Sequence, residues 1–240
     1  MNSNINSTPD IYGQALADFY FRGKLPSPLW VHTSYGTREE MPLPWFFRLP
    51  KEFPELEQYA LSLCQGEILD IGAGVGPHSL YLQQQGFSVT ALEQSTLAAE
   101  IMTDRGVQQI RNITYQDYSG NKIDTMLMLM NGIGLVGNLA GLSDFLSWAK
   151  YYLKPNGQLL FDSSDIAYLF RDQPLPTDYY YGEVQFQYEY QDEYSEWFSW
   201  LYVDATTLER MATLLGWNTQ MVYQDDSDQY LFRLSLSSPF

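Results

Sequence analysis

The chain has 240 residues, of which 45% are hydrophobic, so it can form one α/β domain with a sizeable core and some insertions. Thirteen basic against twenty-nine acidic residues give a formal net charge of −16. This charge disfavours DNA or RNA as a partner, because nucleic-acid affinity depends on neutralising phosphates with Lys and Arg. The sequence has no apolar run of about 18 residues and no basic segment before an apolar one at its start, so we expect neither a membrane span nor a secretory signal.

The single cysteine, Cys64, cannot form an internal disulfide and follows an apolar helical pattern. We interpret it as a small buried residue of a cytoplasmic protein rather than as a catalytic thiol. His32 has no Cys, His or carboxylate partners at ligand spacing, so the sequence predicts no metal site.

The amino-terminal segment, residues 1–54, is predicted to be a helix followed by a flap. Residues 9–22 carry apolar side chains at helical spacing, with Asp10 as a plausible cap. Prolines interrupt residues 23–54, which nevertheless hold many aromatic side chains, so we predict an irregular but ordered segment. Two alternatives remain open: residues 35–48 close over a pocket, or the flap packs on the outside of the main domain at 55–240.

A glycine-rich turn follows the first predicted strand of the main domain. A helix over 54–63 leads into the apolar run 67–71, and the turn to the next helix then carries three glycines, at 72, 74 and 76. Pro77 suits the first position of that helix and replaces the third glycine of the dinucleotide fingerprint. Asp70 at the strand end would repel a pyrophosphate and would favour a ligand with a sulfonium and an ammonium group.

Alternating apolar runs and helical patterns predict the rest of the main domain. The expected strands are 87–93, 113–118, 123–130 and 158–162, and the expected helices are 77–85, 95–105, 142–153 and 206–215. Residues 154–157 would end the 142–153 helix, and an antiparallel pair at 218–223 and 229–235 would close the sheet. The fold class is therefore α/β, with a seven-stranded, mostly parallel, doubly wound sheet.

Motifs spread along the chain resemble a known family. The segment Asp70-Ile-Gly-Ala-Gly-Val-Gly76, Glu93 at the end of the next strand and the Pro-Asn-Gly turn at 155–157 resemble class I S-adenosylmethionine-dependent methyltransferases. The resemblance covers roughly residues 55–240. It implies a Rossmann-like fold, S-adenosylmethionine as cofactor and S-adenosylhomocysteine as product.

The resemblance also implies a set of cofactor-binding residues. They are Asp70, Gly72, Ala73, Gly74, Gly76, Glu93, Gln94, Asp117, Tyr118, Met130 and Asn131. Glu93 would accept hydrogen bonds from the ribose hydroxyls, Asp117 would accept one from the adenine amino group, and Tyr118 would pack on the adenine ring. The segment 131–134 departs from the Asn/Asp/Ser-Pro-Pro-aromatic signature of enzymes that methylate amines of DNA and proteins, so no amine-methylating role is carried over.

Two alternating runs, 184–190 and 197–202, predict a β-hairpin inserted after the fifth strand, within residues 180–203. Its aromatic residues can form an acid-rimmed site for a cationic or aromatic small molecule, so the hairpin is a candidate substrate cap. They are Tyr180, Tyr181, Tyr188, Tyr190, Trp197 and Trp200. The alternatives are that these rings simply cover the sheet or mediate a dimer, and the oligomeric state stays open.

Methyl transfer from a sulfonium is an in-line displacement that needs alignment and exclusion of water rather than a nucleophilic side chain. Where a small-molecule acceptor must lose a proton, His78, Asp162 and Tyr181 are candidate bases by position alone. Two alternative functions are a nicotinamide-dependent oxidoreductase and a catalytically silent protein that binds an adenosine ligand. The oxidoreductase is disfavoured by Pro77 and by the lack of a Tyr-x-x-x-Lys arrangement.

Overall fold

A seven-stranded sheet forms the centre of the computed structural model, which describes residues 9–23, 25–172 and 174–236. Its strands are β3 (Glu67–Ile71), β4 (Ser88–Leu92), β5 (Ile110–Arg111), β6 (Ile123–Met128), β7 (Leu153–Ser164), β11 (Trp217–Gln224) and β12 (Gln229–Leu236). The spatial order is β11-β12-β7-β6-β3-β4-β5, with β3 to β7 parallel and β12 and β11 antiparallel. The predicted seven-stranded, mostly parallel sheet is confirmed.

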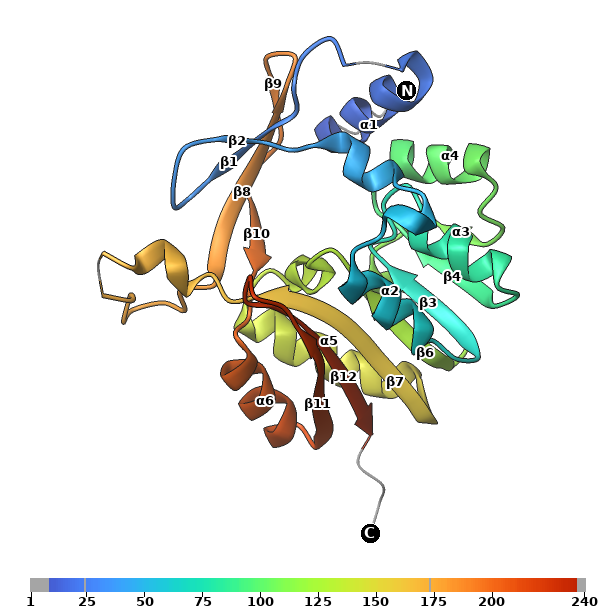
Figure 1. The fold of residues 1–240 in the computed structure, drawn as a ribbon, viewed down its shortest axis with the longest axis vertical. Coiled ribbons are helices and arrows are strands. Elements are labelled where there is room, and N and C mark those ends of the chain that lie inside the picture. The colour runs from blue at the N-terminus through green and yellow to red at the C-terminus, as the bar shows by residue number, and fades with distance from the viewer. Residues whose placement is uncertain (1–8, 24, 173, 237–240) are drawn as a thin grey trace, which may run out of the picture.

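Helices cover both faces of this sheet (Figure 1). The helices of the main domain are α2 (Glu55–Ser62), α3 (Pro77–Gln84), α4 (Thr96–Arg105), α5 (Leu139–Tyr152) and α6 (Ala205–Leu214). Successive strand residues point to opposite faces. Ile68 and Leu127 accordingly pack with α2 and α3, whereas Leu69 and Met126 pack with α5 and α6. The central strands β3 and β6 are buried on both faces, which explains their nearly continuous apolar sequences.

A second, smaller sheet joins the amino-terminal segment to the predicted hairpin. It contains β1 (Trp30–Thr33), β2 (Glu39–Glu40), β8 (Glu183–Tyr190), β9 (Glu193–Tyr194) and β10 (Phe198–Leu201). The order is β10-β8-β1-β2, all antiparallel, with β9 paired to β8 beyond this path. Phe186 lies opposite Phe198, which confirms the hairpin, and Val31 lies opposite Tyr188. We call these five strands the accessory sheet.

The expectation of an irregular flap over residues 23–54 was wrong at β1 and β2. The residues of β1 alternate between buried and partly exposed side chains, and β8 offers them an edge with which to pair. Prolines confine regular structure in the rest of the flap to two short 3-10 helices, η1 (Leu43–Phe47) and η2 (Pro50–Glu52).

Three predicted boundaries in the main domain also need correction. The third strand is β5, at Ile110–Arg111, and not 113–118. Residues Tyr115–Asp117 instead form a 3-10 turn, η3, because the Tyr115 ring packs against Phe145 and Trp148 of α5 at centroid distances of 5.1 and 5.2 Å. Helix α5 begins at Leu139, capped by the side chain of Asn138, and residues 154–157 lie within β7 where its pairing with β6 shifts register.

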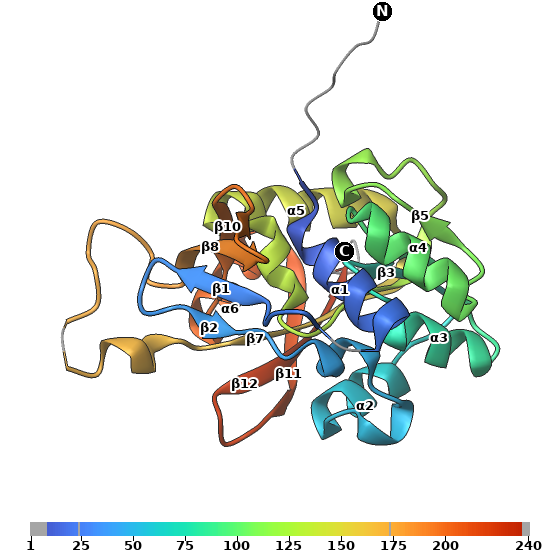
Figure 2. The same cartoon turned by 90° about the horizontal axis from the view of Figure 1, so that it is seen from above.

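The amino-terminal helix α1 (Ile11–Arg22) lies between the accessory sheet and α4, as Figures 1 and 2 both show. Ile11 and Leu16 of α1 are buried in one cluster with Ile101 of α4 and Tyr190 of β8. The predicted cap is confirmed, since the Asp10 carboxylate accepts a hydrogen bond from the Gly13 N–H at 2.8 Å. Among the described residues, no helix is long and apolar enough to cross a membrane.

Candidate functional site

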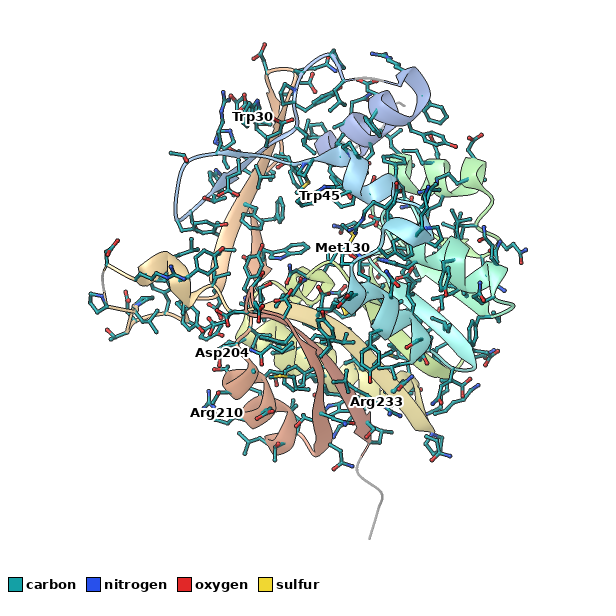
Figure 3. The ribbon with its side chains drawn as sticks, viewed as in Figure 1. Trp30, Trp45, Met130, Asp204, Arg210 and Arg233 are labelled. Atoms are coloured by element: carbon teal, nitrogen blue, oxygen red, sulfur yellow. The ribbon has the colours of Figure 1, made fainter. Side chains whose placement is uncertain are left out.

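The chain order of the strands places one candidate site at the carboxyl edge of the central sheet. From β3 the chain moves outward through β4 and β5, then returns to the other side of β3 with β6 and β7. The carboxyl ends of β3 and β6 therefore meet at a topological switch point, where open α/β sheets bind ligands. Figure 3 shows Met130 at this edge, on the side that faces the accessory sheet.

The glycine loop after β3 has the conformation that its sequence predicts. Gly72, Gly74 and Gly76 have φ values of 72°, 58° and 77°, in the left-handed region that favours glycine. A Cβ on Gly72 would lie 2.4 Å from Leu135 Cδ1, so this position also lacks room for a side chain. The N–H groups of Gly72 and Ala73 both donate to the Leu92 carbonyl, at 2.9 and 3.0 Å, which fastens the loop to β4.

Glu93, at the end of β4, lies directly beside this loop. One carboxylate oxygen accepts the Gly74 N–H and the other the Ser95 N–H, both at 2.8 Å. Burial raises the pKa of Glu93 to about 7, although these N–H donors oppose the shift. Each carboxylate oxygen can accept a second hydrogen bond, so these contacts leave capacity for ribose hydroxyls. Gln94 is exposed, and its carbonyl accepts a hydrogen bond from Asn112 at 3.0 Å.

Helix α1 contributes two residues that the sequence did not point to as part of the site. Asp10 accepts a hydrogen bond from the Ser95 hydroxyl at 2.7 Å, which ties α1 to the start of α4. The Tyr12 hydroxyl lies 3.7 Å from where a Cβ of Gly74 would be, so its ring covers the glycine loop. Tyr12 also stacks on Tyr188 of β8, with centroids 5.4 Å apart. Only the capping pattern at Asp10 was visible in the sequence.

Asp70 and His78 belong to a buried polar network. Asp70 accepts a hydrogen bond from the Ser79 hydroxyl at 2.6 Å, and burial raises its pKa. His78 Nε2 lies 2.8 Å from Glu57, whose second oxygen accepts a hydrogen bond from Arg48 at 2.7 Å. Burial raises the Glu57 pKa, but His78 and Arg48 more than offset this and lower it overall. The buried imidazole is engaged by Glu57, which weakens the case for His78 as a base.

The turn after β6 has unusual backbone geometry. Met130 and Asn131 have φ values of 61° and 57°, which residues with a Cβ seldom adopt. The Asn131 N–H donates to both carboxylate oxygens of Asp162 at 3.0 Å, and its side-chain oxygen accepts from Ser164 at 3.0 Å. Asp162 is fully buried and therefore lies behind the turn.

Of the two residues predicted to contact adenine, Asp117 is exposed and Tyr118 is buried. Asp117 is exposed and accepts a hydrogen bond from the Thr114 hydroxyl at 2.8 Å. The Tyr118 ring is 4% exposed and packs in the core against Tyr152 and Trp148, at 5.0 and 6.3 Å. These neighbours make core packing the observed role of Tyr118, because the turn η3 directs the ring towards α5.

The inner face of the accessory sheet is aromatic. The ring of Phe198 lies 5.0 Å from Tyr188 and 6.5 Å from Trp200, and Phe186 lies within 6.2 Å of both Phe198 and Trp200. Trp200 packs against the 3-10 helix η4 (Gly132–Val136), where a Cβ on Gly134 would lie 2.0 Å from the indole. We call Phe186, Tyr188, Phe198 and Trp200 the aromatic wall.

Four of the six aromatic residues predicted for this site are not part of the aromatic wall. The hydroxyl of Tyr180 donates to Asp204 at 2.6 Å, that of Tyr181 to Asp165 at 2.7 Å, and that of Tyr190 to Asp18 at 2.9 Å. Trp197 is 50% exposed. Tyr181 lies beside the wall, but burial and Asp165 raise the pKa of its hydroxyl, which makes it a hydrogen-bond donor rather than a base.

The fold, the glycine loop and the acidic strand end together define a class I S-adenosylmethionine-dependent methyltransferase. Residues 43–222 match the sequence model of a family described as "Methyltransferase domain". The chain belongs to this family. The match begins within the predicted flap, so the resemblance extends further towards the amino terminus than residue 55.

Solved structures agree with this family. A S-adenosylmethionine-dependent methyltransferase from Bacteroides fragilis, in complex with S-adenosylhomocysteine, is 39% identical, with a TM-score of 0.88 over 97% of this chain and 98% of that one. The methyltransferase CcbJ from Streptomyces caelestis is 14% identical, with a TM-score of 0.62 over 95% and 98%. The glycopeptide N-methyltransferase MtfA with S-adenosylhomocysteine is 15% identical, with a TM-score of 0.57 over 76% and 89%. The latter two show the fold alone, and no curated protein matches the sequence.

The cofactor is therefore S-adenosylmethionine, and the nicotinamide alternative is set aside. The residues present fit this ligand, because the loop at Gly72 and Gly74 exposes backbone and the carboxylates of Glu93, Asp70 and Asp162 suit a ligand with cationic groups. In the part of the chain that the structure describes, no three His, Cys, Asp or Glu side chains are arranged to hold a metal ion.

Proposed function

We propose that the enzyme methylates a small molecule bound between the aromatic wall and the Met130–Asn131 turn. The observation that carries this proposal is the contact of Trp200 with Gly134, because it holds the wall over the loop that follows β6. The Tyr12–Tyr188 stack holds the same sheet over the glycine loop. Acceptor and cofactor would then meet at the switch point, with Glu93 beneath the ribose. The remaining predicted contacts, including Asp117, stay predictions.

The charges around the wall support an uncharged or cationic acceptor with an aromatic or apolar part. The hydroxyls of Tyr12, Tyr35, Tyr188 and Tyr202 have no hydrogen-bond partner among the described residues. Burial raises the pKa of Tyr35 to about 12 and those of the other three as well, so all four are neutral hydroxyls near neutral pH. The nearby arginines Arg38 and Arg48 are paired with Glu189 and Glu57. An acidic acceptor would therefore lack a free cationic partner at this wall among the residues that the structure describes.

The cofactor, when bound, supplies a methyl group on a sulfonium. The residues of the chain bind, align and shield the reactants: the wall excludes water from one side, and the turn after β6 and the glycine loop bound the other. Among the candidate bases, His78 is engaged by Glu57, Asp162 holds a backbone N–H, and Tyr181 donates to Asp165. We therefore propose that alignment, rather than proton abstraction by these three side chains, carries catalysis. The buried thiol of Cys64 supports the proposed cytoplasmic location.

A panel of matched ring compounds tests the acceptor class. Benzylamine, benzyl alcohol and benzoate, with larger homologues of each, would be incubated with S-adenosylmethionine while S-adenosylhomocysteine formation is measured. We expect turnover with amines or alcohols and none with carboxylates. Turnover confined to carboxylates would refute the charge argument.

Trp200→Ala then locates the acceptor site. It should lower turnover of the identified acceptor at least about tenfold, the effect of losing about 1.4 kcal/mol of binding, while affinity for S-adenosylhomocysteine changes less than about twofold. The matched control is Trp30→Ala, since Trp30 lies on β1 away from Met130 (Figure 3) and packs under the Arg38 guanidinium. Equal losses in both variants would mean that the wall supports the fold and not the acceptor.

A further inference from the structure

The Met130–Asn131 turn needs an outside partner to keep its shape. Residues other than glycine are strained in the left-handed region, methionine more than asparagine, and they persist there only where the surroundings hold them. Two occur in succession here, at φ 61° and 57°, directly after β6. Their position at the switch point makes the strain a feature of the site rather than of a surface loop.

Asp162 is the residue that holds this turn. Its side chain is 0% exposed, and both of its oxygens accept the Asn131 N–H at 3.0 Å. The Gln229 side chain, on β12, donates to Asp162 at 2.8 Å. Ser164, two residues further along β7, donates to the side chain of Asn131 at 3.0 Å. The turn is thus fastened directly to β7 and, through Asp162, to Gln229 of β12.

Asp162 has no cationic partner among the described residues, and its two hydrogen-bond donors are both neutral. The charged group that acts on it from α2 is Glu57, which is itself acidic. From the turn after β6 it is faced by the Asn131 N–H, and from β12 by the Gln229 amide. Burying a carboxylate without a cationic partner costs free energy. We therefore expect Asp162 to have a function at the turn that it holds.

We propose that Asp162 is a positioning residue that holds the Met130–Asn131 turn and, as a carboxylate, makes the site favour the cationic S-adenosylmethionine over the neutral sulfur of S-adenosylhomocysteine. The inference rests on the proposed cofactor contacts of Met130 and Asn131. It replaces the earlier expectation of Asp162 as a base. It also gives a reason for product release, because the positive charge near Asp162 is lost when the methyl group leaves.

The pH dependence of binding follows from this charge. Burial raises the pKa of Asp162 to about 7. Above that pH the carboxylate is ionised and favours a cationic ligand, and below it the charge is lost. Affinity for S-adenosylmethionine should therefore fall as pH decreases through 7, by up to about tenfold between pH 8 and pH 6. Affinity for S-adenosylhomocysteine should change by less than about threefold.

The test is calorimetric titration of both ligands into the intact protein at pH 6, 7 and 8. Asp162→Asn should bind S-adenosylmethionine about tenfold more weakly at pH 8, and the ratio of the two affinities should depend less on pH than in the wild type. Glu93 and the α-amino groups of the ligands are present in every variant, so the difference in this ratio between variants isolates the contribution of Asp162. The matched control is Asp124→Asn on the same sheet, where Asp124 pairs with Lys154 at the opposite edge. It should keep the wild-type ratio at each pH.

A second variant separates positioning from folding. Gln229→Met removes a donor that lowers the Asp162 pKa, so the change in the affinity ratio should move to higher pH while the turn keeps its backbone hydrogen bond. If Asp162→Asn does not fold, the shift of the pH profile in Gln229→Met tests the inference by itself. A wild-type ratio and pH profile in Asp162→Asn, or an unshifted profile in Gln229→Met, overturns the inference. The proposed contact of Asn131 is tested apart from it: Asn131→Ala should weaken both ligands, and a normal affinity there would refute the contact itself.

Discussion

The two sheets of this enzyme differ in how much of their structure the sequence pattern predicts. β3, β4, β6 and β7 of the central sheet each carry an apolar run that the sequence alone reveals, although β3 pairs with β6 and β7 with β12 across long stretches of chain. The accessory sheet pairs β1, at residues 30–33, with β8, at residues 183–190, so its pattern emerges only on folding. The central sheet is buried on both faces, whereas the accessory sheet places Phe186 and Tyr188 inward and Gln187 and Glu189 outward. The local sequence pattern therefore predicts the part of the site that binds the cofactor. The part proposed for the acceptor depends on pairing between distant segments of the chain.

The largest expected effect separates the stability of the two sheets. Phe161→Ala removes a ring that is 0% exposed in β7, and we expect a loss of about 3–5 kcal/mol in the free energy of unfolding. Phe186→Ala, in the aromatic wall, should cost less, because its ring is 9% exposed and packs mainly within the accessory sheet. Urea unfolding of both variants measures the difference.

The same two variants should rank in the opposite order when acceptor turnover is measured. Folded Phe161→Ala should retain acceptor turnover per bound cofactor, while Phe186→Ala should lose it. Equal destabilisation by the two substitutions would show that the accessory sheet belongs to the same cooperative core, and the comparison would then fail.

A second prediction concerns the cofactor half alone. Glu93→Ala should weaken S-adenosylmethionine binding by about 1.5–3 kcal/mol, the range for a hydrogen bond to a charged group. The loss has two sources, since Glu93 also orders the glycine loop through the Gly74 N–H. Calorimetry against Glu100→Ala, an exposed glutamate of α4, controls for charge. Unchanged affinity would refute the ribose assignment of Glu93.

The sequence sufficed for the central fold because each of its signals is local. Gly72, Gly74 and Gly76 need positive φ whatever surrounds them, and Gly106 ends α4 for the same reason. The third strand was misplaced because Tyr115 packs on α5, a contact that no pattern within 113–118 reveals.

The parts of the site that the sequence missed depend on distant partners. Tyr12 was missed because only folding brings Tyr188 of β8 to it, and Asp162 was expected as a base because its hydrogen bond from the Asn131 N–H is not visible in the sequence. A tyrosine in a helix and an aspartate at a strand end are ordinary residues until such partners are known. The predicted hairpin was confirmed, but its pairing with the flap required β1 to find the free edge of β8.

The smallest expected effect lies on the outer face of the accessory sheet. Glu189 accepts hydrogen bonds from Arg38 at 2.8 Å and lies 2.5 Å from His32, and these partners lower its pKa. A carboxyl whose pKa is lowered on folding adds stability above its unfolded pKa of about 4.3, and loses it as pH falls through the folded value. Because both partners of this buried carboxylate, Arg38 and His32, are partly exposed, Glu189→Gln should cost less than about 1 kcal/mol at pH 7.

The difference between Glu189→Gln and the wild type should shrink as pH falls through the lowered pKa of Glu189, because the wild-type side chain then becomes neutral. Urea unfolding at pH 7 and pH 3, with Glu193→Gln on exposed β9 as the matched substitution, measures it. A loss above about 3 kcal/mol, the size expected of a broken buried ion pair, would mean that β1 and β8 depend on this cluster for their pairing. The acceptor half of the site would then be held by charge on its outer face as well as by the aromatic wall.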